Sequence, residues 1–348
     1  MNLKPIYELR QKQSLPLEAK IEMTKNRIRE WIDWCANQDK NTYVSFSGGL
    51  DSTVLLDIVR KVDPSTKAVF DDTGLENLDL VKFVKTFDNV DIIRPKLNFV
   101  EVIKKYGYPL FSKEIAECVE QGRKSLELNN GAYAYRLQKL YGTATDTNGN
   151  KSLYNKEKYG ICLDAPFKIS GKCCKASKKD PFDMYNKTNN AYPIIGTTCE
   201  ESQSRETSWR KTGCNGFKSK KPKSQPLSFW LHQDILEYIC NNNLPYCKEV
   251  YGNIEYKDNQ ISLFDDEGIP LTTTKAKRSG CKYCLFGAHM PDDERLLLLK
   301  KNNRKRYDFV LGGGEFVDGM WQPNSEGLGF AYVIDWCNTN VKNCNIKY

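Results

Sequence analysis

The sequence predicts an α/β protein whose main domain is built on a parallel sheet, with a smaller cysteine-containing region toward the C-terminus. Over residues 41–93, short apolar runs alternate with segments of helical periodicity, and a Gly-Gly turn joins the first apolar run to the next helix. Because each such helix returns the chain to the start of the sheet, the strands that it connects run parallel. A Cys-x-x-Cys pair, Cys281 and Cys284, marks the C-terminal region.

The first elements follow from their apolar spacing. Ile28, Trp31 and Ile32 recur at helical intervals and predict a helix over residues 17–38. The elements expected after it are a strand at Tyr43–Phe46, a helix at Thr53–Val62, a strand at Lys67–Phe70, a helix at Asn77–Phe87 and a strand at Val90–Ile93.

The later part of the chain has a weaker pattern. Residues 162–214 are dense in Cys, Lys, Ser and Gly with little periodicity, and this predicts loops packed around a site. The other elements expected are a helix over 113–140, a polar loop over 143–159, a helix over 229–241, a hairpin over 254–270 and a helix over 292–310.

The length of the chain suggests more than one domain. At 348 residues it exceeds the size at which a single hydrophobic core stops growing. We expect an N-terminal helical segment over residues 1–40, a main domain over 41–243 and a C-terminal region over 244–348.

Composition indicates a globular protein outside the membrane. No apolar run approaches the roughly 18 residues that span a bilayer, and the N-terminus lacks the apolar stretch of a signal peptide. We therefore expect a cytoplasmic protein in a reducing compartment, where thirteen cysteines favour metal binding or thiol chemistry over disulfides.

The net charge of +8 has several interpretations. Basic residues bunch at 218–223, 275–278 and 300–306. Such runs usually form solvated surfaces; the alternatives are contacts with a phosphorylated small molecule or with a nucleic-acid backbone.

Residues Ser47–Ser52 read Ser-Gly-Gly-Leu-Asp-Ser and lie between a predicted strand and a predicted helix. The two glycines let main-chain N–H groups approach an anion closely, and the helix directs the positive end of its dipole at the same point. Hydroxyl groups of Ser47, Ser52 and Thr53 add donors. The segment predicts a pocket for phosphate or pyrophosphate, and no Walker-type sequence is present.

This loop resembles the PP-loop of the adenine nucleotide α-hydrolase superfamily, which includes ATP pyrophosphatases, tRNA thiolases and sulfonucleotide reductases. Asp72-Thr73-Gly74, after the next predicted strand, looks like the Asp-Thr-Gly segment of the phosphoadenosine phosphosulfate (PAPS) reductase branch. The resemblance implies a Rossmann-like PP-loop domain that binds an adenine nucleotide at the carboxyl edge of the sheet.

Two cysteine pairs stand out from the other cysteines. Cys173-Cys174 and Cys281-x-x-Cys284 are about a hundred residues apart and can present four thiolates to one centre. Cys-x-x-Cys suits zinc or an iron–sulfur cluster, although adjacent cysteines strain a single tetrahedral ion because neighbouring side chains point apart. Zinc, an iron–sulfur cluster and uncoordinated thiols all remain open on spacing alone.

The segment around the first pair, residues 172–182, resembles the Lys-Cys-Cys…Lys…Pro-Leu segment of assimilatory adenylylsulfate reductases. In those enzymes a Cys-Cys pair and a Cys-x-x-Cys pair bind a 4Fe–4S cluster. The resemblance therefore implies a 4Fe–4S cluster on Cys173, Cys174, Cys281 and Cys284.

A third segment, residues 195–205, looks like the Gly-x-Arg-x-x-Glu-Ser-x-x-Arg segment of the same branch. Arg205 matches an arginine that can fork onto a phosphate or sulfate, or it is a salt-bridged residue of a surface loop. Thr198 stands where the first arginine is usual, so one anion contact is missing or has moved. The nucleotide contacts that the resemblances imply are Ser45, Ser47, Gly48, Gly49, Asp51, Ser52, Thr53, Asp72, Thr73, Gly74, Glu201 and Arg205.

The tail departs from the sulfonucleotide reductases. Those enzymes carry a C-terminal Glu-Cys-Gly-(Leu/Ile)-His segment whose cysteine attacks the sulfonate sulfur, whereas this chain ends in Asn343-Cys344-Asn345-Ile346-Lys347-Tyr348. Cys344 is the candidate nucleophile, but its basic neighbours Lys342 and Lys347 are weak grounds for a lowered pKa.

Three functions are then to be tested. The first is a PAPS reductase-like iron–sulfur enzyme that binds ATP or a related adenylyl nucleotide, with Asp51 positioning Mg²⁺, and adenylates or thiolates an acceptor with pyrophosphate release. The acceptor is a nucleic acid or a small molecule, and a thiol or sulfur donor protein is implied. The second is a thiol-dependent sulfonucleotide reductase that releases sulfite and depends on Cys344. The third is a nucleotide-binding partner protein without turnover. The catalytic candidates are Asp51, Arg205 and Cys344.

Overall fold

Packing divides the chain into two compact units, each with its own hydrophobic core. The computed structural model describes residues 4–257 and 270–348. Unit 1 consists of Met1–Asp72, Glu76–Arg94 and Pro181–Ser279, and unit 2 of Thr73–Leu75, Pro95–Asp180 and Gly280–Tyr348. Each of the two large clusters of buried side chains lies within one unit. The units are defined by packing, so the sequence-continuous segments 1–40, 41–243 and 244–348 stay a prediction.

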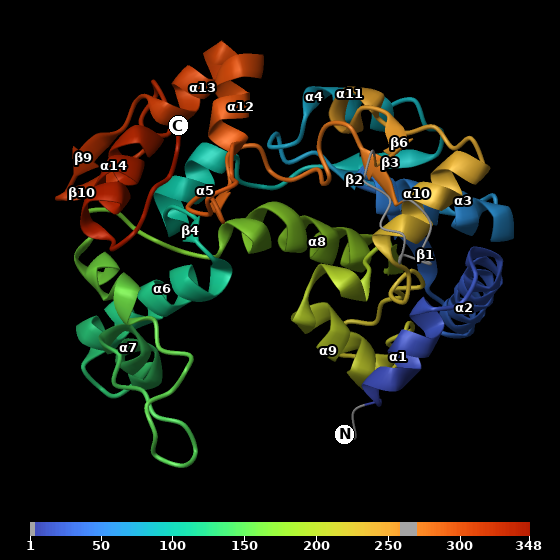
Figure 1. The fold of residues 1–348 in the computed structure, drawn as a ribbon, viewed down its shortest axis with the longest axis horizontal. Helices are drawn as coiled ribbons and strands as arrows, with labels where there is room; N and C mark the ends of the chain where they lie inside the picture. Colours follow the sequence, from blue (N-terminus) through green and yellow to red (C-terminus); the bar gives the residue numbers. More distant parts are fainter. Residues whose placement is uncertain (1–3, 258–269) are drawn as a thin grey trace, which may run out of the picture. The chain divides into compact units, whose positions relative to one another are not determined.

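A four-stranded parallel sheet forms the centre of unit 1 (Figure 1). Its strands are β1 (Asn41–Ser45), β2 (Lys67–Asp71), β3 (Val90–Ile93) and β5 (Ala191–Ile195), in the order β3-β2-β1-β5. β1 pairs in parallel register with β2 on one side and β5 on the other, so Ser45 lies beside both Val69 and Ile195. The α/β class with a parallel sheet is thereby confirmed.

Helices flank this sheet on unit 1. They are α1 (Ile6–Gln13), α2 (Leu17–Asn37), α3 (Leu50–Val62), α4 (Leu78–Val84), the 3₁₀ helix η3 (Cys199–Glu201), α9 (Gln203–Thr212), α10 (His232–Asn241) and α11 (Lys248–Tyr251). α2 and α10 both pack against α3 (Figure 1). A buried ion pair between Lys20 Nζ and Asp234 Oδ2, 2.7 Å apart, joins α2 to the start of α10.

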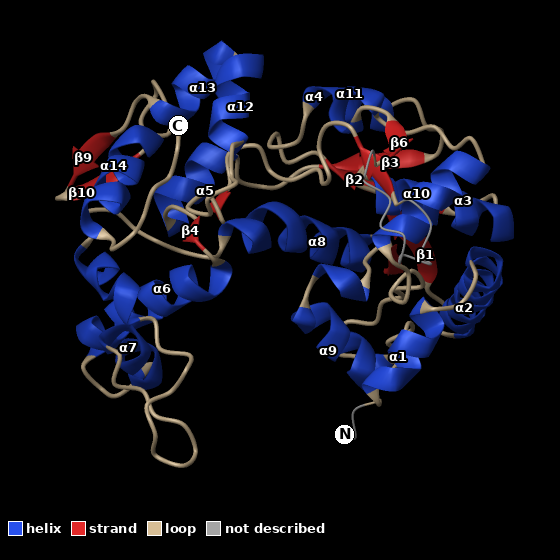
Figure 2. Cartoon of the chain, viewed as in Figure 1, coloured by secondary structure: helices blue, strands red, loops and turns tan. Residues whose placement is uncertain are grey.

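Unit 2 is mainly helical (Figure 2). Its elements are α5 (Phe99–Tyr106), β4 (Leu110–Phe111), α6 (Lys113–Leu128), α7 (Ala134–Tyr141), the 3₁₀ helix η1 (Glu157–Asp164), the π-helix η2 (Lys175–Lys179), β8 (Leu285–Phe286), α12 (Arg295–Asn302), α13 (Arg304–Leu311), the hairpin strands β9 (Glu315–Val317) and β10 (Met320–Gln322), and α14 (Phe330–Asn340). α8 (Asp180–Thr188) starts at the last residue of the middle segment of unit 2 and continues in unit 1.

The prediction of loops over residues 162–214 is wrong. This stretch contains β5, α8 and α9 as well as η2, η3 and the end of η1. Its helices are polar along most of their length, so apolar periodicity does not reveal them. β5 contains Pro193, which a sheet accepts at an edge strand because that residue lacks an N–H donor.

Two predicted helices are each broken into two. The helix expected over 113–140 stops at Asn129, which adopts a left-handed conformation with φ 45°. The helix expected over 292–310 breaks at Asn303, whose side chain caps the second half by accepting from the Arg306 N–H. The predicted hairpin over 254–270 is represented by β6 (Ile254–Tyr256) and β7 (Leu271–Thr273), which pair antiparallel; most of the predicted turn lies outside the described residues.

Among the described residues, no helix combines the length and the apolar character required to cross a bilayer.

Candidate functional site

The loop between β1 and α3 requires a glycine at position 48. Gly48 adopts a left-handed conformation, φ +71°, and a methyl group on it would lie only 2.8 Å from Val84 Cγ2. A side chain at Gly48 would therefore be strained by its backbone and blocked by its neighbour.

Hydroxyl groups brace the same loop. Ser47 Oγ and Ser52 Oγ are 3.0 Å apart, and Ser52 Oγ also donates to the Gly49 carbonyl at 2.9 Å. Thr53 Oγ1 donates to the same carbonyl at 2.9 Å and is buried. Thr53 thus stabilises the first turn of α3, whereas Ser47 and Ser52 also reach the pocket beside the loop.

A cavity of about 270 Å³ lies against this loop, and all its lining residues belong to unit 1. The loop supplies one wall, and residues 195–205 after β5 supply another. A methyl group on Gly196 would lie 3.0 Å from the Asp51 carbonyl oxygen, so glycine at this position permits the close approach of the two walls. His232 of α10, Tyr251 of α11 and residues 277–279 complete the lining.

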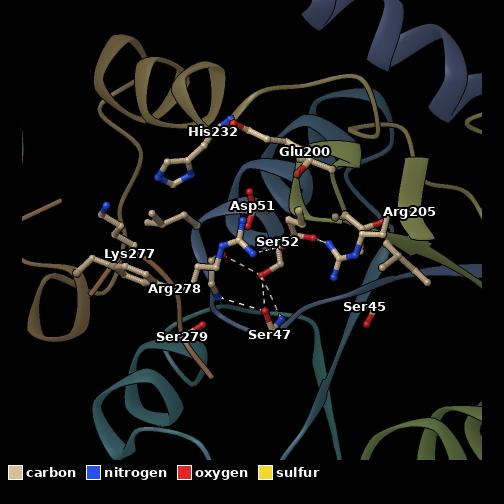
Figure 3. A pocket seen from close by; sticks show the side chains of 18 residues that line it. Ser45, Ser47, Asp51, Ser52, Glu200, Arg205, His232, Lys277, Arg278 and Ser279 are labelled. Carbon is tan, nitrogen blue, oxygen red and sulfur yellow. Dashed lines mark hydrogen bonds and ion pairs between the residues drawn. The ribbon is translucent and has the colours of Figure 1, made fainter. Parts of the chain in front are cut away.

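Cationic side chains converge on the cavity. Figure 3 shows Arg205 and Arg278 on either side of Ser52, with His232 and Lys277 toward the Arg278 side. Burial first, and then the nearby Arg278 guanidinium, lower the pKa of Arg205. Two guanidinium groups that repel each other across a cavity are stabilised by an anion between them.

Glu201 partly balances these charges. It forms an ion pair with Arg205, and its Oε1 lies 3.9 Å from Arg278 Nη1. The backbone N–H of His232 donates to Glu200 Oε2 at 2.7 Å, which fixes the start of α10 against the η3 segment. The lining therefore combines three cationic side chains, Arg205, Lys277 and Arg278, with the carboxylates of Asp51, Glu200 and Glu201.

Asp51 brings a half-buried carboxylate to the cavity from the first turn of α3. Burial raises its pKa, while His232, Arg278 and Arg205 oppose that rise. Burial therefore disfavours the ionised form of this carboxylate. Its position beside an anion site suits it to coordinating Mg²⁺ that accompanies a phosphate.

The structure brings together most, but not all, of the predicted nucleotide contacts. Ser45, Ser47, Gly49, Asp51, Ser52, Glu201 and Arg205 line the cavity. Gly48 and Thr53 shape the loop. Asp72 instead contacts Arg94, with Oδ2 3.3 Å from Nη2, and Thr73 and Gly74 belong to unit 2. A contact of Asp72, Thr73 or Gly74 with the nucleotide stays a prediction.

The two cysteine pairs lie in unit 2 and are brought near each other by the segment containing β4. Tyr108 bridges to Ile169, upstream of Cys173, and β4 itself pairs in parallel with β8, just beyond Cys284. Cys173 and Cys174 open a helical stretch that continues into η2, and their Sγ atoms are 4.0 Å apart.

The four thiols interact electrostatically. The pKa of Cys174 is lowered to about 6, chiefly by the Cys173 S–H donor and also by Lys113 and Lys178. Cys173 is correspondingly held as the thiol by that hydrogen bond and by burial, with further effects from Cys284 and Cys281. Arg295 lies against Cys284 and opposes the rise in pKa that burial causes there.

The four thiols are the donor set of the predicted cluster. Within residues 4–257 and 270–348, no three His, Cys, Asp or Glu side chains are grouped closely enough to hold a metal ion, so the structure does not show these thiols assembled as ligands. A 4Fe–4S cluster is bound by four cysteines at separate iron corners, and Lys113, Lys178 and Arg295 offset the negative charge of such a centre. The chemistry of Cys173, Cys174, Cys281 and Cys284 suits a 4Fe–4S cluster, which stays a prediction.

Cys344 is part of the packed structure of unit 2. Its Sγ donates to Asn338 Oδ1 at 3.5 Å, and its backbone N–H donates to the Val341 carbonyl at 3.0 Å. Burial raises its pKa, an effect that Lys158 only partly opposes. A thiol held in this way is a poor nucleophile.

Sequence comparison identifies the family. The phosphoadenosine phosphosulfate reductase domain matches residues 41–252, which run from the first residue of β1 to just after α11 and exceed half of the chain. The chain belongs to the phosphoadenosine phosphosulfate reductase domain family.

Individual relatives of this family member share little sequence identity with it or match only a short part of it. An uncharacterized protein of Methanocaldococcus jannaschii is 37% identical over 87 residues, 24% of this chain and 21% of that protein, so the chain spans about a fifth of that relative. An adenosine 5'-phosphosulfate reductase of Lysinibacillus sphaericus is 23% identical over 267 residues, 76% of this chain and 83% of the relative. The crystal structure of the phosphoadenylyl-sulfate reductase from Candida auris, a phosphate complex, is 18% identical with a TM-score of 0.35, and the match covers 68% of this chain and 91% of that one.

Several residues that line the unit 1 cavity of this PAPS reductase family member were not predicted from the sequence. Lys277, Arg278 and Ser279 follow the hairpin, and His232 opens α10. The available signal was the basic run at 275–278, which also fitted a solvated surface. Arg278 lines the same cavity as Thr198 and provides there the guanidinium that Thr198 lacks.

Proposed function

We propose that the chain is an iron–sulfur enzyme of sulfur chemistry that binds ATP or a related adenylyl nucleotide in the unit 1 cavity. The observation that carries this proposal is the convergence of Arg205, Arg278, Lys277 and His232 on a rigid Ser-Gly-Gly loop. Such a site suits an anion of several charges, because main-chain N–H groups, the start of α3 and cationic side chains all point toward it.

The first reaction is activation of an acceptor by ATP. An acceptor oxygen forms a bond to the α-phosphorus while the bond from that phosphorus to the bridging oxygen breaks, and pyrophosphate leaves with the electron pair. A sulfide-level sulfur donor then forms a bond to the acceptor atom that carries this oxygen, while the bond between that atom and the oxygen breaks and AMP leaves with the oxygen and the electron pair. This reaction is favoured over thiol attack because the Cys344 thiol is engaged with Asn338 and has a raised pKa.

The cavity residues have distinct roles in this reaction. The loop N–H groups and Ser47 hold the leaving pyrophosphate, and Arg205 and Arg278 offset the charge that grows on it. Asp51 holds Mg²⁺ against the phosphates. His232 lines the cavity, and its imidazole takes up the proton that the attacking hydroxyl loses.

Cys173, Cys174, Cys281 and Cys284 would hold a 4Fe–4S cluster in unit 2. When bound, such a cluster supplies one-electron redox chemistry or a site for sulfur. The chain's own contribution is positive charge near the thiols: Lys113 and Lys178 help to lower the pKa of Cys174, and Arg295 opposes the rise that burial causes in the pKa of Cys284.

A second candidate function is thiol-dependent reduction of a sulfonucleotide, favoured by the relatives named adenosine 5'-phosphosulfate reductase. A thiolate would attack the sulfonate sulfur, the adenylyl phosphate would leave, and a second thiol from a donor protein would then release sulfite. This route requires Cys344 to leave its hydrogen bond with Asn338, or another thiol to take its place.

The test uses the anaerobically purified 348-residue chain. Iron and acid-labile sulfide are measured first, and then pyrophosphate from ATP and sulfite from PAPS and adenosine 5'-phosphosulfate. We expect about four irons per chain, lost in Cys174→Ser and Cys284→Ser but retained in Cys240→Ser, an exposed cysteine of unit 1 that serves as the control.

The products separate the candidates. Pyrophosphate that depends on Arg278 supports the activating enzyme, whereas sulfite that depends on Cys344 supports the reductase and overturns the first reaction. Zinc or no metal would remove the cluster from the proposal. Tight nucleotide binding without either product would identify a nucleotide-binding partner protein instead of an enzyme.

A further inference from the structure

The excess positive charge of the chain resides entirely in unit 2. Unit 1 contains 27 Lys and Arg and 27 Asp and Glu, whereas unit 2 contains 25 Lys and Arg against 17 Asp and Glu. The net charge of +8 therefore belongs to the unit that carries the two cysteine pairs, although the nucleotide cavity lies in the neutral unit.

Part of this excess forms a lysine face beside the first cysteine pair. α5 packs against η2, the turn that directly follows Cys174. The lysine face is defined here by four of the five exposed lysines of these two elements: Lys104, Lys105, Lys175 and Lys179. The fifth, Lys178, helps to lower the pKa of Cys174. The acidic residues of the same elements are Glu101, whose carboxylate is engaged in capping α5, and Asp180 at the end of η2.

These four lysines are not neutralised within the described parts of the chain. No ion pair forms between any of them and an acidic side chain in residues 4–257 and 270–348. By contrast, the nearby Lys172 is paired with Glu120, and Lys139 with Glu114. Like charges collected on one face without counter-charges indicate an anionic partner.

We propose that the lysine face binds the phosphate backbone of a nucleic acid, which is the acceptor for the sulfur chemistry. The binding stands on the charges described above; only the role as acceptor rests on the proposed function. The charge is spread along two helical elements, and none of the four lysines lines the unit 1 cavity. This arrangement suits a chain of phosphates better than one small anion.

A nucleic acid is favoured over an acidic protein by the aromatic side chains of the same unit. Of the exposed Tyr, Phe and Trp side chains among the described residues, six belong to unit 2 and two to unit 1. The six are Tyr133, Tyr135, Tyr141, Tyr154, Phe309 and Phe316. Exposed rings on a basic unit offer stacking surfaces for unpaired bases.

The test is fluorescence anisotropy with labelled single-stranded DNA, single-stranded RNA and duplex DNA, at several salt concentrations. The variant replaces Lys104, Lys105, Lys175 and Lys179 by Gln. The matched control replaces four exposed lysines of unit 1, Lys187, Lys211, Lys218 and Lys220, by Gln and removes the same charge.

We expect the parent chain to bind at least one of these strands and the lysine-face variant to bind it at least tenfold more weakly at low salt. For a single strand, the slope of log affinity against log salt should flatten by about 2–3, because each lost phosphate contact contributes roughly 0.7. The strand that binds best identifies the source of the backbone. The control should keep both the affinity and the slope.

Three results would overturn the inference: no binding by the parent chain, equal losses in variant and control, or equally tight and equally variant-sensitive binding of poly-glutamate, which would indicate an acidic protein partner. Nucleotide affinity of the lysine-face variant is measured in parallel. It should be unchanged, because none of the four lysines lines the unit 1 cavity. Loss of strand binding and failure of the nucleotide proposal are therefore separate outcomes.

Discussion

Replacing Arg278 by Ala tests directly whether the unit 1 cavity binds phosphate. The Arg278 side chain is 65% exposed and its Nη1 lies 3.9 Å from Glu201 Oε1, so this ion pair is loose and the guanidinium is available to a ligand. A hydrogen bond to a charged group is worth about 1.5–3 kcal/mol. The loss of this contact should therefore weaken ATP binding by roughly 10- to 150-fold.

The assay is isothermal titration calorimetry with a non-hydrolysable ATP analogue and Mg²⁺. The matched control is Lys275→Ala, which removes one positive charge from the same segment but does not line the cavity. Because the control residue is exposed, its long-range effect is screened by salt, and the dissociation constant should change by less than about twofold.

Thermal unfolding of the same two variants shows whether they remain folded, and little change is expected for either because both side chains are exposed. Equal losses of affinity in Arg278→Ala and Lys275→Ala would refute the argument. They would mean that the ligand responds to general charge and not to a guanidinium directed into the cavity.

Three further predictions concern the elements that support the cavity. Gly48→Ala should lower the stability by about 1–3 kcal/mol and abolish nucleotide binding, because a left-handed backbone and contact with Val84 both oppose a side chain; thermal unfolding and calorimetry check this, and an unchanged melting temperature would contradict it. Asp51→Asn should stabilise the nucleotide-free protein at pH 7, because burial raises the pKa of Asp51 and the ionised form is held at a cost. The gain should shrink as the pH falls through the folded pKa and vanish below the unfolded pKa, where Asp51 is neutral in both the folded and the unfolded state. A gain that is constant in denaturant melts from pH 7 to 4 would refute the assignment. Lys20→Met should cost about 3–5 kcal/mol by leaving the buried Asp234 unpaired, and a midpoint of urea unfolding close to that of the parent would show that the pair is not important.

The fold could be predicted where the pattern was local. β1, β2 and β3 with their crossover helices follow from short apolar runs that alternate with amphipathic ones, and the structure confirms them. β5 could not be predicted in the same way because it is stabilised by pairing with a strand that is distant in the sequence. It is a five-residue edge strand with a proline, paired to β1 across about 150 residues and covered on its other side by Ser224.

The same distinction applies to the site. The Ser-Gly-Gly loop is recognisable because its shape depends on six consecutive residues, one of which must adopt a positive φ. Arg278 and His232 reach the cavity from distant segments, through the packing of α10 and the hairpin, and nothing in their immediate neighbours indicates this. The convergence of the cysteine pairs likewise depends on bridges from the β4 segment to two remote segments.

The division into two interleaved units also sets an order in which the protein can be completed during synthesis. The chain passes from one unit to the other five times, and the last passage falls between Ser279 and Gly280. Ser279 is also the last residue that lines the nucleotide cavity, and Cys281 follows two positions later. On the ribosome, every residue of the cavity has therefore emerged before the second cysteine pair, at a point where unit 2 still lacks residues 280–348. A message cut short after this point would yield a chain with all the residues of the nucleotide cavity and only half of the thiols for the cluster.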